Sequence, residues 1–220
     1  MTLTSDPTRL FTAKVRSYER FVRFVRYPQG IRAFFSSSSL LCSRLRVLDA
    51  GCGTGIVTLA LRDALLARGF SPGPLHGFDL TPAMLQRFRH SVKKHAIDGV
   101  ELVQANVLHL ESLPSSWRNY DLIVSASMLE YVQRDRFVAA LLGLRALLND
   151  KGKLLLFITR KNWIMRQLVG RWWQSNVCGA IELRRSFSSA GFPAFEFRTF
   201  PPAFNYLNLW GFIIEARTCA

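Results

Sequence analysis

The residues best suited to chemistry lie in one short stretch, where an acidic side chain precedes three closely spaced glycines. Asp49 stands two residues before Gly51, and Gly53 and Gly55 follow at alternate positions. An apolar run ends here and a helix-like run begins, so the glycines lie where a buried strand turns into a helix. Such a turn leaves backbone N–H groups unpaired at the helix start, and glycine lets a ligand approach that backbone closely.

The glycine spacing separates two classes of nucleotide ligand. A dinucleotide site is marked by G-x-G-x-x-G, whereas the third glycine comes one residue early in residues 51–55. The carboxylate of Asp49 would repel a pyrophosphate, and it suits a ligand that carries an ammonium and a sulfonium centre. The stretch resembles motif I of the class I S-adenosylmethionine (SAM)-dependent methyltransferases. A nicotinamide-dependent oxidoreductase, which would need the longer spacing, is the disfavoured alternative.

A second carboxylate follows at the end of the next expected strand, residues 75–79. Thr81 and Pro82 come soon after Asp79 and fit the cap and the first position of a helix. An acidic residue at the end of the second strand of a nucleotide-binding half can accept hydrogen bonds from both ribose hydroxyls. Residues 77–81 are also similar to the second motif of the same methyltransferases, so Asp79 is the expected ribose ligand.

Two further strand ends complete the expected pocket. Residues 100–107 form a third strand and its exit, where this family commonly carries an aspartate that accepts from the adenine amino group. The position here is Asn106, whose amide oxygen can still accept, but without the charge-assisted part of the interaction. Residues 120–125 form the fourth strand, and their position resembles the family's fourth motif.

The resemblance therefore implies a site for SAM as the cofactor, assembled from four strand ends. Cys52, with the glycines beside it, would approach the methionine end, and Leu80 would flank the adenine. Val107 would meet the adenine edge, and Ser125 would lie near the amino-acid moiety. The expected cofactor-binding residues are Asp49, Gly51, Cys52, Gly53, Gly55, Asp79, Leu80, Asn106, Val107 and Ser125.

Residues that could act on the methyl acceptor are fewer and less specific. Glu130 and Tyr131 lie just past the fourth strand, and Tyr18 could reach over from an N-terminal cap. Packing or a solvated charge is the more common role of such residues, and a base is needed only if the acceptor must lose a proton. Neither a Pro-Pro-aromatic sequence nor a cysteine follows the fourth strand, which argues against nucleobase methylation. The cysteines lack metal-ligand spacing and the histidines form no cluster, so no metal site is expected.

The N-terminal segment that precedes these motifs is expected to be helical. Apolar residues recur at three- and four-residue spacing between positions 11 and 27, and arginines line another face. Pro28-Gln29-Gly30 is expected to interrupt this helix, and residues 36–39 to form a polar loop. In the methyltransferases this segment often forms a cap over the cofactor, and simple packing on the sheet is the equal alternative.

The remaining chain alternates between helix-like and strand-like runs. After the fourth strand we expect a helix over 138–148, a turn over 149–152, a strand over 153–158, a helix over 182–190, a strand over 195–200, a loop over 201–208 and a strand over 210–216. The fold class is α/β, and the resemblance implies a Rossmann-like, doubly wound, mostly parallel seven-stranded sheet with an antiparallel last strand. Residues 1–39 would form the N-terminal helical cap and residues 40–220 the SAM-binding methyltransferase domain.

The net charge of +14 is distributed unevenly along the 220 residues. Residues 47–150 contain ten basic and ten acidic side chains, whereas residues 1–46 and 151–220 each carry an excess of seven positive charges. Both flanks interleave aromatic residues with arginines, a composition that suits an amphiphile or a membrane interface and also RNA. No apolar run has the length of a membrane span.

The predicted function is SAM-dependent methylation of an oxygen, nitrogen or carbon atom of a small molecule with anionic, amphipathic or lipid-like character. The protein is expected in the cytoplasm, with peripheral association at the membrane surface, because the N-terminus resembles no signal peptide and the cysteines read as reduced thiols. An RNA-modifying methyltransferase and a non-enzymatic SAM-binding protein are the alternatives, with nucleic acid the less favoured partner. The sequence leaves the oligomeric state open.

Overall fold

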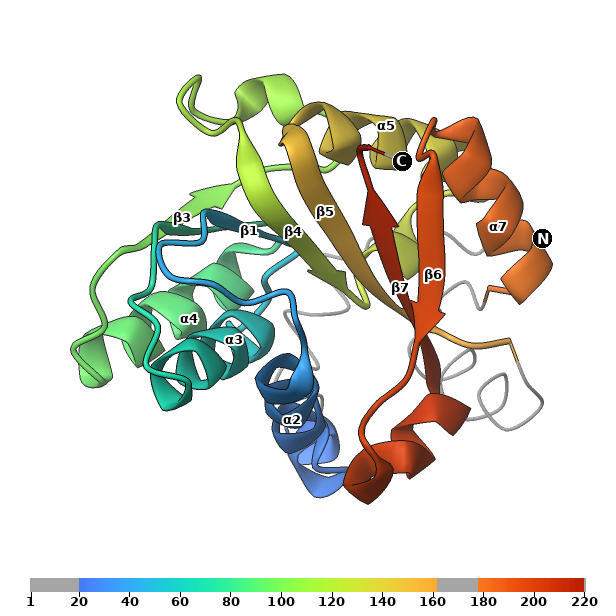
Figure 1. Cartoon of the computed structure of the whole chain (residues 1–220). Helices are drawn as coiled ribbons and strands as arrows, with labels where there is room; N and C mark the ends of the chain where they lie inside the picture. The colour runs from blue at the N-terminus through green and yellow to red at the C-terminus, as the bar shows by residue number, and fades with distance from the viewer. Residues whose placement is uncertain (1–19, 162–177, 220) are drawn as a thin grey trace.

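The computed structural model describes residues 20–161 and 178–219, and a seven-stranded sheet lies at its centre (Figure 1). The strand order is β3-β2-β1-β4-β5-β7-β6. Strands β1 to β5 are parallel, and β7 runs antiparallel to both of its neighbours, which confirms the predicted fold class. The strands are β1 Val47–Ala50, β2 Leu75–Asp79, β3 Val100–Gln104, β4 Tyr120–Ala126, β5 Leu148–Thr159, β6 Ala194–Arg198 and β7 Gly211–Arg217.

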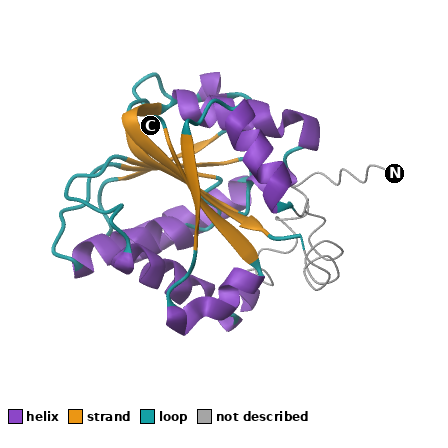
Figure 2. Cartoon of the chain, turned by 45° about the vertical axis from the view of Figure 1, so that its right-hand side comes forward, coloured by secondary structure: helices purple, strands orange, loops and turns teal. Residues whose placement is uncertain are grey.

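Helices cover both faces of the sheet (Figure 2). Buried side chains of β5 alternate between the two faces, because successive residues of a strand point in opposite directions. Leu155 and Phe157 join one buried cluster, whereas Leu154 and Leu156 join the other. The first cluster lies under α2 (Tyr27–Ser37) and α3 (Ile56–Ala67), with α4 (Pro82–Lys94) on the same side, and the second lies under α5 (Phe137–Ala146) and α7 (Ala180–Ser189).

The parallel strands bring the predicted motifs to one edge of the sheet. The strand order runs outward from β1 to β3 on one side and from β4 on the other, so a topological switch point lies between β1 and β4. In such sheets, ligands bind outside the carboxyl ends of the strands at this point. The ends of β1, β2, β3 and β4 carry the four expected motifs, and the topology therefore places them around one crevice.

The helical N-terminal segment breaks earlier than predicted. Residues 20–24 are helical, but the chain turns at Val25–Arg26, where Arg26 has a φ of 53°, and α2 then begins. Pro28 therefore starts a helix and does not interrupt one, because the first helical turn does not use the N–H that proline lacks. The predicted loop over 36–39 is also partly wrong, since Ser36–Ser37 form the last turn of α2. The Ser37 hydroxyl donates to the carbonyl of Ala33 at 3.0 Å, which keeps a polar residue in the helix.

Helix α2 belongs to the packed layer on the sheet. Its buried residues Ile31, Phe34 and Phe35 share a core cluster with Leu155 and Phe157 of β5. This part of the predicted cap segment therefore contributes to the core. Residues 1–19, with the acceptor-side candidate Tyr18, lie outside the described residues, so a cap over the cofactor stays a prediction.

Two predicted loops have regular backbone structure. The expected turn over 149–152 belongs to β5, but it bulges, because Tyr120 pairs with Leu148 while Leu122 pairs with Lys153. The expected loop over 201–208 forms 3₁₀ turns over Pro202–Leu209, for which proline at the start is favourable. The residues of both segments are typical of turns, which is why loops were predicted. The pairing of residues 149–152 within β5 and the 3₁₀ turns over Pro202–Leu209 could not be predicted from those residues.

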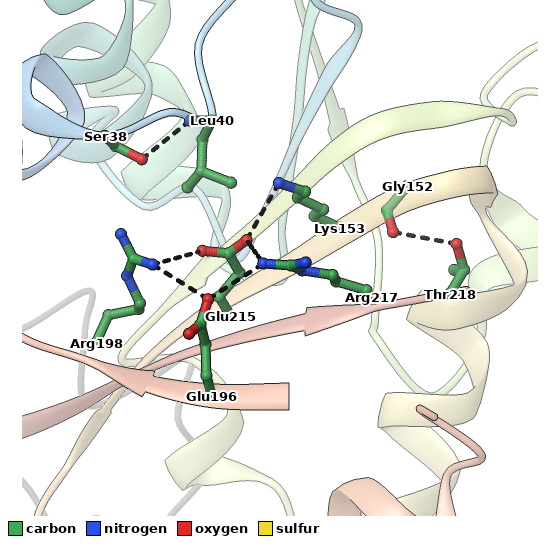
Figure 3. A network of polar contacts seen from close by, with 9 residues as sticks. All are labelled: Ser38, Leu40, Gly152, Lys153, Glu196, Arg198, Glu215, Arg217 and Thr218. Atoms are coloured by element: carbon green, nitrogen blue, oxygen red, sulfur yellow. Dashed lines mark hydrogen bonds and ion pairs between the residues drawn. The ribbon is translucent and has the colours of Figure 1, made fainter. Parts of the chain in front are cut away.

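An ion-pair network occupies the outer strands on the face opposite α7 (Figure 3). Glu215 of β7 is only 2% exposed, yet its carboxylate lies 3.2 Å from Lys153 Nζ, with the guanidinium groups of Arg198 and Arg217 at 3.8 and 3.5 Å. Glu196 contacts the same two arginines at 3.1 and 3.2 Å. A buried carboxylate is costly unless it is paired, so these cations explain how β7 accommodates one. Charges on edge strand β6 also oppose pairing with another chain.

Candidate cofactor-binding site

A cavity of about 340 Å³ lies at the carboxyl ends of β1, β2, β3 and β4. The ends of these strands converge there, as the topology requires, and the walls are mostly apolar with a few polar groups. This is the usual composition of a small-molecule site. Of the expected cofactor-binding and acceptor-side residues, those that line it are Gly51, Gly53, Asp79, Leu80, Asn106, Val107 and Tyr131.

The glycine turn forms one wall of this cavity. Gly51 has a φ of 77° and Gly53 a φ of 53°, a left-handed conformation that side chains rarely adopt. A Cβ at Gly51 would collide with the side chain of Met128, whereas a Cβ at Gly53 would meet no atom within 4 Å. The Gly53 backbone therefore borders open space on the cavity wall, where a ligand can approach it closely.

Two members of the motif build the turn and do not line the cavity. The Cys52 N–H donates to the carbonyl of Phe78 at 2.9 Å, which fastens the turn to β2, and its side chain is buried. Gly55 is the N-cap of α3 and packs so closely against Phe88 that a Cβ would not fit. Both residues act through the conformation of the turn, since neither borders the open space.

Asp49 lies buried behind the glycine turn. Its carboxylate accepts a hydrogen bond of 2.6 Å from the Thr58 hydroxyl and a further one from the Thr58 backbone N–H. Burial, supported by the nearby charge of Asp79, raises the pKa of Asp49 from 3.8 to about 7 despite the bonds from Thr58. A cationic ligand in the cavity would favour the ionised form.

We expect Asp49→Asn to weaken the pH dependence of stability in the cofactor-free protein. Unfolded Asp49 ionises near pH 3.8, whereas in the folded chain it keeps its proton up to about pH 7. The folded state binds more protons in this window, so the free energy of unfolding falls as the pH rises through it. The contribution is on the order of a few kcal/mol. Urea unfolding from about pH 5 to about pH 8 measures it.

The asparagine variant should be relatively more stable at the alkaline end of that series. Glu130, whose pKa burial also raises, keeps its contribution in both proteins. Asp79 is electrostatically coupled to Asp49, so the difference between the two slopes reports on Asp49 together with this coupling. Parallel slopes would show that Asp49 is already ionised at the lower pH.

Asp79 is held in place by backbone groups before any ligand binds. One carboxylate oxygen accepts from the Gly53 N–H at 2.9 Å, and the other accepts from the Thr81 N–H at 2.8 Å. The Thr81 hydroxyl also bonds to Asp79 and makes no cap bond to α4, which corrects the predicted capping role. A carboxylate has about four acceptor sites, so these three donors leave one for a ligand hydroxyl. Burial raises the pKa of Asp79, and these donors oppose the rise.

Asn106 forms a local turn at the exit of β3. Its side-chain oxygen accepts from the backbone N–H of Leu108 at 3.0 Å, and both residues line the cavity with Val107. An amide oxygen has two lone pairs, so one remains for a ligand donor. Leu80 lies on the same wall and is partly exposed, which suits contact with a planar ring.

Two of the three predicted residues at the end of β4 and just beyond it do not line the cavity. Ser125 is fully buried, is not among the cavity-lining residues, and its hydroxyl has no hydrogen-bond partner among the described residues. Glu130 is also buried, accepts from the Thr159 N–H at 2.9 Å, and has its pKa raised by burial. Tyr131 does line the cavity, so the structure brings only one of the two neighbouring acceptor-side candidates to it.

The structure adds cavity residues that the motifs did not indicate. Ser127 has a φ of 55°, an uncommon conformation for serine, and it lines the cavity beside Met128. Met128 also closes over Gly51, and Arg136 is the only basic residue among the lining residues. Strand alternation could have indicated this. Ser125 falls on the same strand face as the buried Ile123, and the cavity wall begins one residue later, at Ala126.

The polar groups of the cavity fit a nucleoside ligand that carries a cationic substituent. Asp79 offers a charged acceptor for a ribose hydroxyl, Asn106 an acceptor for a ring amine, and Gly53 an open backbone. Buried acidic groups lie on the same side, and the described residues hold no group of three or more His, Cys, Asp or Glu side chains arranged to bind a metal. These features match the chemistry of SAM, which carries a ribose, an adenine, an ammonium and a sulfonium.

Known proteins support this assignment by sequence and by fold. The family described as "Methyltransferase domain" matches residues 41–182. The uncharacterized protein MJ0638 of Methanocaldococcus jannaschii is 29% identical over 121 residues, which cover 55% of this chain and 44% of that protein. The chain thus matches less than half the length of that curated relative.

Two solved structures resemble the whole fold. Magnesium protoporphyrin IX methyltransferase from Synechocystis PCC 6803, solved with bound SAM, has a TM-score of 0.65 at 15% identity and covers 99% of each chain. The YcgJ protein from Bacillus subtilis has a TM-score of 0.64 at 13% identity, covering 87% of this chain and 99% of that one. At these identities the likeness concerns the fold, while the family match covers more than half of the sequence. The chain belongs to the methyltransferase-domain family, whose members use SAM as the cofactor.

Proposed function

We propose that this protein is a SAM-dependent methyltransferase whose acceptor is a small molecule. The observation that carries the proposal is the pairing of Gly53 and Asp79 in one cavity. Gly53 presents an open backbone, and its N–H fixes the carboxylate that would hold the ribose. A turn built only for packing needs neither the open space nor the preorganised acceptor.

The roles of the residues follow from their positions. SAM supplies a methyl group on a sulfonium, which is already a good leaving group, so alignment provides much of the catalysis. Asp79 would hold the ribose and Asn106 the adenine edge, while Gly53 admits the methionine portion. Tyr131 lines the same cavity and is the described candidate for contact with the acceptor. Glu130 is buried and already hydrogen-bonded to Thr159, which favours a positioning role.

The proposed acceptor carries an oxygen, nitrogen or carbon nucleophile and has anionic or amphipathic character. Both basic flanks of the sequence support this, and Arg136 supplies a positive charge on the cavity lining itself. Asp79 is the one acidic residue that lines the cavity within the described parts of the chain. An anionic group on the acceptor would therefore find a complementary charge beside the cofactor site.

Peripheral association with a membrane is part of the same proposal. Among the described residues, no helix is both long and apolar enough to cross a bilayer. Basic and aromatic side chains, such as those on the two flanks of the sequence, are suited to contact with the surface of a membrane that holds a lipid-like acceptor.

A methyl-transfer screen with labelled SAM tests the proposal. Small molecules, lipids and RNA are offered as acceptors to the full chain and to Asp79→Ala. Transfer to a small molecule or lipid that is strongly reduced in the variant supports the function. Transfer to RNA alone would favour the RNA-modifying alternative, and SAM binding without transfer to any class would favour a non-enzymatic role.

We expect Asn106→Asp to preserve SAM binding or to tighten it by up to about tenfold. The carboxylate would keep the bond from the Leu108 N–H and add charge to the acceptor that meets the adenine amino group. Calorimetry with SAM measures the change, and thermal unfolding checks the fold. A large loss of affinity in a folded variant would show that Asn106 does not accept from the adenine.

A further inference from the structure

A second, wider hollow lies beside the cofactor cavity on the outside of the molecule. It has a volume of about 560 Å³ and lies between α3 and α4, with the N-terminal helical turn at residues 20–24 beside it. Thr54 lines this hollow and its neighbour Gly53 lines the cavity, so the two spaces meet across the glycine turn. We call it the basic groove.

The basic groove is lined by several basic side chains. Arg23, Arg87 and Lys94 border it together with His90 and His95, and within residues 20–161 and 178–219 no aspartate or glutamate lines it. Neither the guanidinium of Arg23 nor the ammonium of Lys94 has an ion pair or hydrogen bond within the described parts of the chain. The groove therefore presents positive charge that the described protein does not neutralise.

Two exposed apolar side chains lie on the elements that border the groove. Phe24 follows Arg23 directly and is 87% exposed. Leu66 of α3 is 47% exposed and lies two turns beyond the groove residue Leu59, on the same face of the helix. Both side chains are therefore available to enter an apolar phase that the groove's cations approach.

We propose that the basic groove and the exposed Phe24 and Leu66 dock the protein on an anionic membrane surface. The cations would contact lipid phosphates, and the two apolar side chains would enter the acyl boundary. The docking site extends the proposed function, because an amphipathic acceptor would be delivered beside the glycine turn. The affinity for SAM is measured separately, so that a failure of membrane docking can be distinguished from a failure of the proposed cofactor site.

The apolar side chains favour a lipid surface over a nucleic acid. A polyanion such as RNA would satisfy the cations, and an aromatic ring such as Phe24 can stack on a base. An exposed leucine gains little from a phosphate backbone, whereas it gains free energy on entering hydrocarbon. The combination of aliphatic, aromatic and basic groups therefore fits the interface of a bilayer.

Vesicle sedimentation of the full chain tests the docking surface. Vesicles of phosphatidylcholine mixed with phosphatidylglycerol are compared with phosphatidylcholine alone, across a series of sodium chloride concentrations. The double variant Arg23→Gln/Lys94→Gln should partition about 10- to 30-fold less onto the anionic vesicles. Arg118→Gln/Lys151→Gln removes the same charge near the amino ends of β4 and β5 and should bind like the wild type.

A second pair of variants tests the insertion of an apolar side chain into the bilayer separately from the attraction of basic side chains to lipid phosphates. Phe24→Ser should reduce anionic-vesicle binding several-fold, whereas Ile181→Ser, which changes a 69% exposed residue on α7, should not. Calorimetry with SAM should give unchanged affinity in all four variants, which also shows that they are folded. Wild-type vesicle binding by the groove variant would overturn the proposal, as would tight RNA binding on filters without any vesicle association.

Discussion

Asp79→Ala is expected to raise the Kd for SAM by roughly 30- to 150-fold, or about 2 to 3 kcal/mol. Asp79 lines the cavity and has one acceptor site beyond the three used by Gly53 and Thr81. Alanine would remove a charged acceptor from the ribose and leave the two backbone donors without their partner. Isothermal calorimetry with SAM and S-adenosylhomocysteine measures the loss for both ligands.

Two companion variants show whether the loss comes from the carboxylate. Asp79→Asn keeps one acceptor of similar shape, so we expect an affinity between those of the wild type and the alanine variant. Thr81→Val removes only the hydroxyl beside Asp79 and should have a smaller effect. An unchanged affinity in Asp79→Ala would sink the assignment of this residue to the ribose.

Gly53→Leu is expected to lower the affinity for SAM by at least about 100-fold while the protein still folds. A Cβ at this position meets no protein atom, so the side chain can project into the cavity without disturbing the core. Its φ of 53° adds a backbone cost of about 1–2 kcal/mol to folding. The larger effect on binding arises because the leucine would occupy the space that the methionine portion needs.

A matched control separates backbone strain from occupancy of the cavity. Gly99 has a φ of 75°, and a Cβ there also meets no atom within 4 Å, but it does not line the cavity. Gly99→Leu should lose a similar amount of stability in urea unfolding and keep its SAM affinity. Equal affinities for the two variants would place the cofactor away from the glycine turn.

The fold class could be predicted because the informative patterns are local. Apolar runs marked the buried strands, and β2 occupies the predicted range Leu75–Asp79. The errors fall where tertiary contacts override local signals. Pro28 and the serines after it suggest a break, yet α2 continues through Ser37 because its other face is buried against β5. Residues 149–152 look like a turn, yet pairing with β4 draws them into a bulged strand.

The candidate site divides in the same way. The sequence by itself predicted one cofactor site that contains Asp49, Asp79 and the glycines, because strand ends of a parallel sheet must meet at one edge. Only the tertiary structure decided which of these residues line the cavity. Asp49 and Cys52 are buried behind the turn, Ser125 and Glu130 are turned into the core, and Met128 with Arg136 completes the wall. The spacing of residues along the chain determines at which strand end each residue lies. Whether its side chain faces the cavity or the core depends on packing against elements that are distant in sequence.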